Sequence, residues 1–257
     1  MKKRGLHSEI NNGSVPPERA RKKRCQIENV AAVLRYVLDC LRRGMDTKEQ
    51  SRKRFRIMDF GCGSGNVGLA LAWLFPNCDF VLVDNRKRSV ELAQERAIRA
   101  GLRNVETQLA DIMHVECSFD VGLAVHACGD ATDLSQLQCF KFNVPYILVP
   151  CCMGKINGKK GSKRIERFES RELKHPRSIW MKRELKLERY FELAKLADLH
   201  SYNPKTSATP HSETEEEVST RKHHEYRRLC KAVLECDRNQ AAFEEGYSVY
   251  LGKLWPL

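Results

Sequence analysis

The stretch DFGCGSGNVG, residues 59–68, decides the fold, because it places glycines at short intervals directly after an apolar run. One pattern within it, G-x-G-x-x-G, begins at Gly63 and has the spacing of a dinucleotide-binding loop. A second pattern, D-x-G-x-G-x-G, begins at Asp59 and has the spacing of a loop that binds a nucleoside sulfonium. Both patterns use glycine because the absence of a Cβ lets the backbone approach a ligand. The two imply different cofactors, so residues outside the loop must decide between them.

Apolar segments with strand spacing and with helix spacing alternate on both sides of this loop. The expected strands are 55–60, 80–83, 105–109, 121–125 and 146–149, and the expected helices between and before them are 18–43, 67–75 and 89–100. A further helix, capped by Asp130 or Thr132, is expected to extend to about Cys139. This β-α-β-α order predicts an α/β fold with an open, doubly wound, mostly parallel sheet, whose ligands bind at the carboxyl ends of the strands. Two more helices, 179–197 and 226–245, and a last strand, 247–251, are expected after the sheet.

The domain organisation follows from changes in composition along the chain. Residues 1–16 are polar and end in Pro-Pro, so we expect a flexible N-terminus. Residues 17–257 then form a single domain, which is long enough for one large α/β core. Within it we expect a basic insertion at 153–189 and a mobile, low-complexity loop at 202–220.

The charge of the chain indicates a polyanionic partner. The formal net charge is +12, and the basic residues cluster at 19–24, 52–56 and 155–189. Such clusters attract phosphate backbones, so we expect RNA to bind through 19–24 and 155–189, although a solvated basic face is the alternative. No apolar run is long enough for a membrane span, and a protein partner is left open. The eleven cysteines lie in apolar segments and fit reduced thiols in the cytoplasm or nucleus.

Three acidic residues decide between the two loop patterns. Asp59 ends the first strand and can hold the loop backbone or accept from the ammonium of an amino-acid-like cofactor. Asp84 ends the second strand, where an acid can bind both ribose hydroxyls. Asp111 follows the third strand and suits an exocyclic adenine amine. Acids at three successive strand ends favour S-adenosylmethionine over NAD, against the alternative that all three are ordinary turn and helix-start residues.

Several motifs resemble a known family. They are PPERARKKRCQIENV (16–30), DFGCGSGNVGLALA (59–72), HACGDATD (126–133), VPCCMGKI (149–156) and DRNQAAFEEGYSV (237–249). The chain resembles the class I S-adenosylmethionine-dependent methyltransferases with a Rossmann-like fold. Among these it is similar to the methyltransferase domain of glutathione S-transferase C-terminal domain-containing proteins. The glycine loop is specific only to the superfamily, whereas the pair formed by HACGD and PCCMG is more specific.

The resemblance implies a methyltransferase that uses S-adenosylmethionine. The candidate cofactor-binding residues are Asp59, Gly61, Cys62, Gly63, Gly65, Asn66, Asp84, Asn85, Asp111 and His126. The His-x-Cys-Gly and Cys-Cys motifs are more distantly similar to a group of tRNA ribose methyltransferases, which implies a tRNA or rRNA substrate by analogy. The alternatives are a methyltransferase for protein or small molecules, and a non-catalytic, methyltransferase-like RNA-binding or assembly factor.

The candidate catalytic residues follow the fourth and fifth strands. His126 and Asp130 would face the methyl acceptor, and Cys128 and Cys151 could act as helper and nucleophile on a pyrimidine base. His126, Cys128, Cys151 and Cys152 also offer nitrogen and sulfur atoms to a metal, but adjacent cysteines rarely chelate one ion well. Packing of small apolar thiols is the reading that we favour here, and we expect no metal.

The end of the chain departs from the class I pattern. Such domains usually close with a hairpin whose last strand is antiparallel, but this sequence ends at LGKLWPL, directly after the expected strand 247–251. We therefore expect that the last antiparallel strand is missing, either because the chain is truncated or because the sheet keeps an exposed edge.

Overall fold

The computed structural model describes residues 16–153, 156, 173–197 and 215–254, without the side chains of Ser51 and 215–221. The chain divides into two compact units, which are described separately. The first contains Met1–Ala127, Leu134–Val149 and Lys253–Leu257, and the second contains Cys128–Asp133 and Pro150–Gly252.

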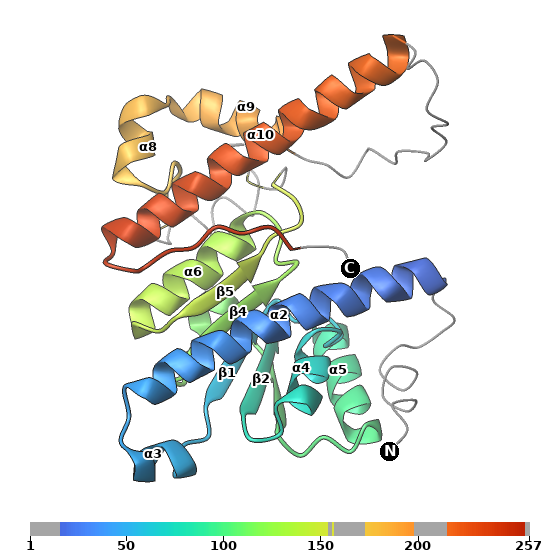
Figure 1. Cartoon of the computed structure of the whole chain (residues 1–257), viewed down its shortest axis with the longest axis vertical. Helices are drawn as coiled ribbons and strands as arrows, with labels where there is room; N and C mark the ends of the chain where they lie inside the picture. Colours follow the sequence, from blue (N-terminus) through green and yellow to red (C-terminus); the bar gives the residue numbers. More distant parts are fainter. Residues whose placement is uncertain (1–15, 154–155, 157–172, 198–214, 255–257) are drawn as a thin grey trace. The chain divides into compact units, whose positions relative to one another are not determined.

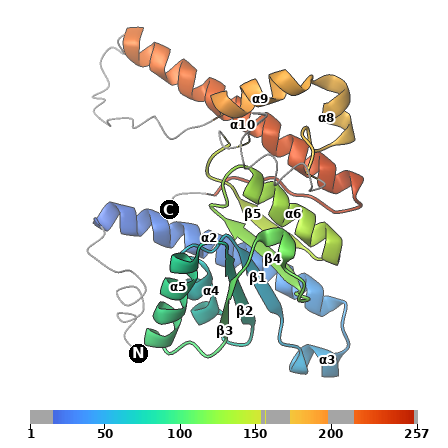
Figure 2. The ribbon, with the colours of Figure 1, turned by 180° about the vertical axis from the view of Figure 1, so that it is seen from behind.

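The first unit is built on a five-stranded sheet. Its strands are β1 (Arg56–Phe60), β2 (Asp79–Asp84), β3 (Val105–Leu109), β4 (Val121–Val125) and β5 (Tyr146–Val149). They lie side by side in the order β3-β2-β1-β4-β5 (Figure 2), and each neighbouring pair is parallel. Because the strand order reverses at β1, the carboxyl ends of β1 and β4 flank the point where doubly wound folds bind ligands. The predicted α/β fold with a parallel sheet is confirmed.

Helices α2 (Pro17–Arg43), α4 (Gly68–Leu74) and α5 (Lys87–Arg99) pack on one face of this sheet. The apolar stripe of α2, with Val30, Leu34 and Leu38, joins Leu69 of α4 and Ala93 of α5 in one buried cluster with the strands. Figure 1 shows α2 running past β1 and β2. Burial of this stripe, rather than intrinsic propensity, stabilises a helix of this length. A short helix, α3 (Thr47–Arg52), connects α2 to β1.

The opposite face of the sheet is covered by α6 (Asp130–Phe142). Successive side chains of a strand point to opposite faces of the sheet. Phe60 is not part of the buried cluster that contains α2, so it points to the other face. Phe60 contacts Phe119 edge-on with centroids 5.6 Å apart, and Phe119 contacts Phe142 of α6 at 5.0 Å. Gly122 of β4 lies under Cys139 of α6, where a Cβ would have no room.

The second unit has a separate core. Helices α8 (Ile179–Glu184), α9 (Leu187–Leu196) and α10 (Glu215–Glu244) surround buried Met153, Met181, Tyr190 and Leu234. Of the helices that the structure describes, none has the length and apolar character needed to cross a bilayer.

Three expectations from the sequence are wrong within the described residues. The helix expected over 179–197 is broken at Leu185, whose extended backbone ends α8 before α9 begins. Residues 215–220, expected in a mobile loop, form the first turns of α10. Residues 247–251, expected as a strand, pair with no strand of the sheet. Residues that are common in strands form one only where a free sheet edge accepts them, and the sequence of the segment does not show whether such an edge exists. Residues 154–155 and 157–172 of the expected insertion at 153–189, and residues 202–214, lie outside the described residues.

Candidate active site

The glycine loop between β1 and α4 forms the floor of the candidate site in the first unit. Gly61, Gly63 and Gly65 all have positive φ, at 65°, 57° and 76°. The loop is tied to the second strand, because the Cys62 amide donates to the Val83 carbonyl at 3.0 Å. Burial raises the pKa of the Cys62 thiol, so this predicted cofactor residue is a neutral thiol. The glycines thus allow a left-handed backbone without side chains at the carboxyl end of β1.

Asp59 lies beneath this loop and is almost fully buried. Its carboxylate accepts a hydrogen bond from the Gly68 backbone, and a Cβ on Gly68 would lie 2.5 Å from Asp59 Oδ2. Of the two roles expected for Asp59, the structure therefore places it in the one that holds the loop backbone. Burial raises the pKa of Asp59 to about 7, although the Gly68 hydrogen bond acts in the opposite direction.

Replacing Asp59 with asparagine should remove part of the pH dependence of stability. The folded state holds the Asp59 proton more tightly than the unfolded state does. The free energy of unfolding of the wild-type protein should therefore fall as pH rises from about 4 towards 7. Between pH 5 and pH 7 this loss is on the order of 2 kcal/mol. Urea unfolding at both pH values should show this loss in the wild-type protein and a smaller loss in Asp59→Asn. Equal losses in the two proteins would contradict the assignment.

Asp84 at the end of β2 is the acid best placed for a ligand's hydroxyl groups. It is 5% exposed, and its Oδ2 accepts from the Gly63 amide at 2.9 Å. Its Oδ1 accepts from the Arg86 amide at 2.9 Å and from Arg86 Nε at 3.1 Å. The Arg86 side chain is 69% exposed, so it can move away from the carboxylate at little cost. Asn85, also predicted to bind the cofactor, is exposed on the turn that follows Asp84.

Arg96 of α5 supports the loop from the side, and the sequence analysis missed it. It is 3% exposed, and its NH1 donates to the Ser64 carbonyl at 2.6 Å, to Ser64 Oγ at 3.1 Å and to Asn66 Oδ1 at 2.9 Å. The predicted cofactor residue Asn66 is itself exposed. The available signal was an arginine between Ala93 and Ala97, in the buried stripe of an amphipathic helix. A charge in such a stripe needs a partner, which here is the loop.

Replacing Arg96 with methionine should weaken S-adenosylmethionine binding about tenfold, because the loss of about one net charge-assisted hydrogen bond leaves the loop less ordered. Calorimetric titration measures this directly. Arg88→Met, at an exposed position on the same helix, is the matched control and should bind like the wild type. Equal affinity in both variants would show that Arg96 does not position the loop.

Asp111 lies after β3, as expected, but its visible contact is with its own chain. Its Oδ1 accepts from the Met113 amide at 3.1 Å and caps the short helix η1 (Ile112–His114). It is half-buried, so part of its side chain is open to a ligand.

His126 follows β4 in a conformation that is rare for a residue with a side chain. Its φ is 62°, while its amide donates to the Val149 carbonyl at 3.0 Å. The exposed imidazole lies with Nε2 3.0 Å from Oε1 of Gln26 on α2. Non-glycine residues with such backbones cluster at functional sites, where the surrounding structure holds them. Gln26 is a second residue that the sequence analysis missed, because it lies 100 positions earlier in the chain.

In the second unit, the predicted cysteines are brought together. The Sγ atoms of Cys128 and Cys151 are 3.0 Å apart, and those of Cys151 and Cys152 are 3.8 Å apart. Burial, followed by the hydrogen bond with Cys128, raises the pKa of Cys151, which disfavours the thiolate that a nucleophile requires.

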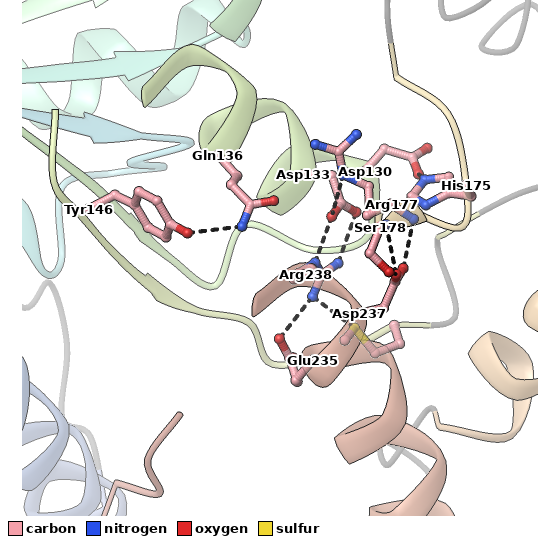
Figure 3. Close-up of polar contacts among 11 residues, drawn as sticks. Asp130, Asp133, Gln136, Tyr146, His175, Arg177, Ser178, Glu235, Asp237 and Arg238 are labelled. Atoms are coloured by element: carbon pink, nitrogen blue, oxygen red, sulfur yellow. Dashed lines mark hydrogen bonds and ion pairs between the residues drawn. The ribbon is translucent and has the colours of Figure 1, made fainter. Parts of the chain in front are cut away.

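Asp130 and Asp133 belong to a buried polar network (Figure 3). His175 Nε2 lies 3.4 Å from Asp130 Oδ1. Asp133 accepts from Arg238 Nε at 2.7 Å and NH2 at 2.9 Å, and Arg177 Nε is 3.6 Å away. Asp133 thus lies in the first turn of α6 and is also an ion-pair partner.

The same network joins the start of α8 to α10. Asp237 accepts from the Ser178 hydroxyl at 2.6 Å and from the Ser178 amide at 2.8 Å. It also accepts from the Arg177 amide at 2.7 Å. Arg177 lies inside the predicted basic insertion. It therefore contacts buried carboxylates of the second unit.

The basic clusters differ in how far their charges are already paired. In 52–56, Lys53 pairs with Asp120, Arg54 with Asp79 and Arg56 with Glu106, at 2.7–2.9 Å. In the first turns of α2, Lys22 pairs with Glu18. Within the described part of the chain, no ion pair involves the other four basic residues of that segment, which are Arg19, Arg21, Lys23 and Arg24.

The residues around the glycine loop fit a nucleoside cofactor. A Cβ on Gly63 would enter the space beside the Arg86 side chain, 3.9 Å from its NH2, so glycine leaves that space to a ligand next to Asp84. Gly61 and Gly63 would border S-adenosylmethionine, Asp84 would accept from its ribose, and Asp111 would receive its adenine amine. When bound, the cofactor supplies a methyl group already activated on a sulfonium.

More than half of the chain matches a known family model, and several known proteins are similar to it in sequence. The family model described as "Methyltransferase domain" matches residues 51–208, more than half of the chain. The glutathione S-transferase C-terminal domain-containing protein of Homo sapiens is 27% identical over 248 residues, covering 95% of this chain and 32% of the relative. The Drosophila melanogaster homolog is 28% identical over 245 residues, covering 95% of this chain and 36% of the relative. The chain thus spans about a third of the length of the curated relatives that it matches.

Solved structures of methyltransferases are also similar to this chain. Magnesium protoporphyrin IX methyltransferase from Synechocystis PCC 6803 with bound SAH has a TM-score of 0.38 and 17% identity, covering 52% of this chain and 59% of that one. Coclaurine N-methyltransferase bound to N-methylheliamine and SAH has a TM-score of 0.30 and 24% identity, covering 45% and 30%.

Proposed function

The chain belongs to the methyltransferase domain family, and from this premise we propose that it transfers a methyl group from S-adenosylmethionine to RNA. The predicted family, its methyl donor and the transferase class are confirmed by the match. The RNA substrate is the proposed part.

One contact carries the RNA proposal. Gln26 of α2 approaches the imidazole of His126 at 3.0 Å, and the basic segment 19–24 ends only two residues before Gln26. Both residues belong to the first unit, which also contains the glycine loop. A phosphate backbone held by the basic turns of α2 would therefore pass close to the residue that ends β4. Four cations there form no ion pair with any residue that the structure describes, and they would supply the sequence-independent part of nucleic-acid affinity.

His126 would orient the acceptor at the end of β4. The methyl donor is already activated, so the protein mainly has to position the acceptor and exclude water. A neutral imidazole can also take a proton from an acceptor that carries one, such as a ribose hydroxyl.

Replacing Arg19, Lys23 and Arg24 together with glutamine should weaken RNA binding and flatten its dependence on salt. Each lost phosphate contact should reduce the slope of log affinity against log salt concentration by about 0.7–0.9. Fluorescence anisotropy with a labelled RNA at several salt concentrations measures this slope. Arg54→Gln, whose guanidinium already pairs with Asp79, is the control and should leave the slope unchanged.

The substrate class is tested with a radioactive methyl donor. The full chain is incubated with labelled S-adenosylmethionine and a cell extract, and the RNA, protein and small-molecule fractions are counted. Label in RNA that falls in the triple variant supports the proposal. Label confined to protein or to small molecules would overturn it, and donor binding without any transfer would favour the non-catalytic assembly factor.

A further inference from the structure

Three thiols converge in the second unit, at a place where the proposed methyl transfer does not use them. The Sγ atoms of Cys128, Cys151 and Cys152 all lie within 4.8 Å of one another. Cys128 and Cys151 are half-buried, so an ion can reach them, and Cys152 is 3% exposed. No disulfide involves these cysteines.

The segments that carry the thiols are held in position by other parts of the same unit. The Gly129 amide donates to the Cys152 carbonyl at 3.3 Å and joins the two segments directly. On one side of the cysteine pair, Lys231 Nζ of α10 donates to the Pro150 carbonyl at 2.8 Å. On the other side, Arg238 NH1 lies 3.3 Å from Met153 Sδ. The three sulfur atoms are therefore presented by a fixed backbone.

The neighbouring positions of Cys151 and Cys152 do not prevent them from sharing an ion. Adjacent residues of an extended strand point to opposite faces, which is why such pairs chelate poorly. Here the backbone has left β5, and the two Sγ atoms are 3.8 Å apart. Sulfur atoms bound to one tetrahedral zinc ion at about 2.3 Å are separated by about 3.8 Å.

We propose that Cys128, Cys151 and Cys152 bind a zinc ion through their three sulfur atoms, with a fourth coordination position left for water. Each thiol loses its proton to solvent as its sulfur–zinc bond forms. Soft thiolate donors select zinc over magnesium, calcium or manganese. A disulfide explains the arrangement less well, because it would join only two of the three sulfurs, and 3.0 Å exceeds the S–S bond length of about 2.0 Å.

The test is the zinc content of the full chain, purified without chelators and then dialysed against zinc. Mass spectrometry of the metal should find about one zinc ion per chain. Cys128→Ser, Cys151→Ser and Cys152→Ser should each reduce the zinc content at least severalfold. Cys236→Ser, at an exposed position on α10, is the matched control and should keep the full content. Circular dichroism verifies that each variant is folded.

A second measurement needs no variant. Bound zinc should protect these three cysteines from alkylation by iodoacetamide, and a chelator should abolish this protection, as read by peptide mass spectrometry. Cobalt in place of zinc should give thiolate-to-metal charge-transfer absorption. A wild-type protein that takes up no zinc would overturn the proposal. A Cys128–Cys151 disulfide that forms in its place would also do so. Zinc content does not depend on methyl transfer, so failure of the RNA proposal would leave this result unaffected.

Discussion

Replacing Arg238 with methionine is expected to destabilise the second unit by about 3–5 kcal/mol, because it leaves the buried carboxylate of Asp133 without its main partner. Asp133 and Arg238 are 0% and 3% exposed, and the guanidinium makes two hydrogen bonds to the carboxylate. Methionine keeps much of the side-chain volume, so the loss reports the charge rather than a cavity. Urea unfolding followed by circular dichroism measures it.

The pH dependence of the stability lost in Arg238→Met shows whether the lost charge or the altered packing is the cause. Burial by itself raises the pKa of Asp133, but the charge and hydrogen bonds of Arg238 outweigh it, so the pKa lies below its ordinary value. In the wild type this pair therefore stabilises the fold above about pH 4, and the stabilisation is lost as pH falls through the lowered pKa. Without Arg238 the carboxyl group should protonate more readily, so the deficit should shrink towards pH 4.

Two further variants complete the argument for this ion pair. Asp133→Asn combined with Arg238→Met removes both charges and should recover part of the stability lost in the single variant. Arg189→Met, at an exposed pair with Glu192 in α9, should cost at most about 1 kcal/mol. A deficit in Arg238→Met that is equally small, or independent of pH, would contradict the role given to the pair.

The second large effect is expected at the cofactor site. Replacing Asp84 with alanine should weaken S-adenosylmethionine binding at least 100-fold, or about 3 kcal/mol. The variant removes the carboxylate that would accept from the ribose, and it also removes the partner of the Gly63 amide, so the glycine loop is less ordered. Hydrogen bonds to a charged acceptor contribute about 1.5–3 kcal/mol each, so the loss of two accounts for this magnitude.

Calorimetry with S-adenosylmethionine and S-adenosylhomocysteine measures this effect, with NADH as a further ligand. Asp79→Ala, at the partly exposed opposite end of the same strand, is the matched control and should bind normally. Arg86→Ala should bind at least as well as the wild type, because Arg86 competes for the Asp84 carboxylate. Unchanged affinity in Asp84→Ala would place the ribose elsewhere, and binding of NADH would reopen the dinucleotide interpretation.

The sequence by itself determined the sheet and the glycine loop. Strands buried on both faces are continuous apolar runs, and a loop that needs positive φ at several positions selects glycine there, so both signals are local. The five strands and the helices between them were predicted within a few residues, and the loop with Asp59 and Asp84 was identified. The final strand and the single helix over 179–197 were wrong, because a sheet edge and a helix break depend on neighbours distant in sequence.

Only the tertiary structure decided which distant residues meet. Gln26 and His126 are 100 positions apart, and Asp133 and Arg238 are 105 positions apart. Nothing in either local sequence selects the partner, because a charge or an amide can pair with any complementary group that the fold brings near. The convergence of the three thiols has the same origin. The motifs HACGD and PCCMG follow two strands that become neighbours only when the sheet forms. The cysteines of the two motifs therefore come together only in the folded chain.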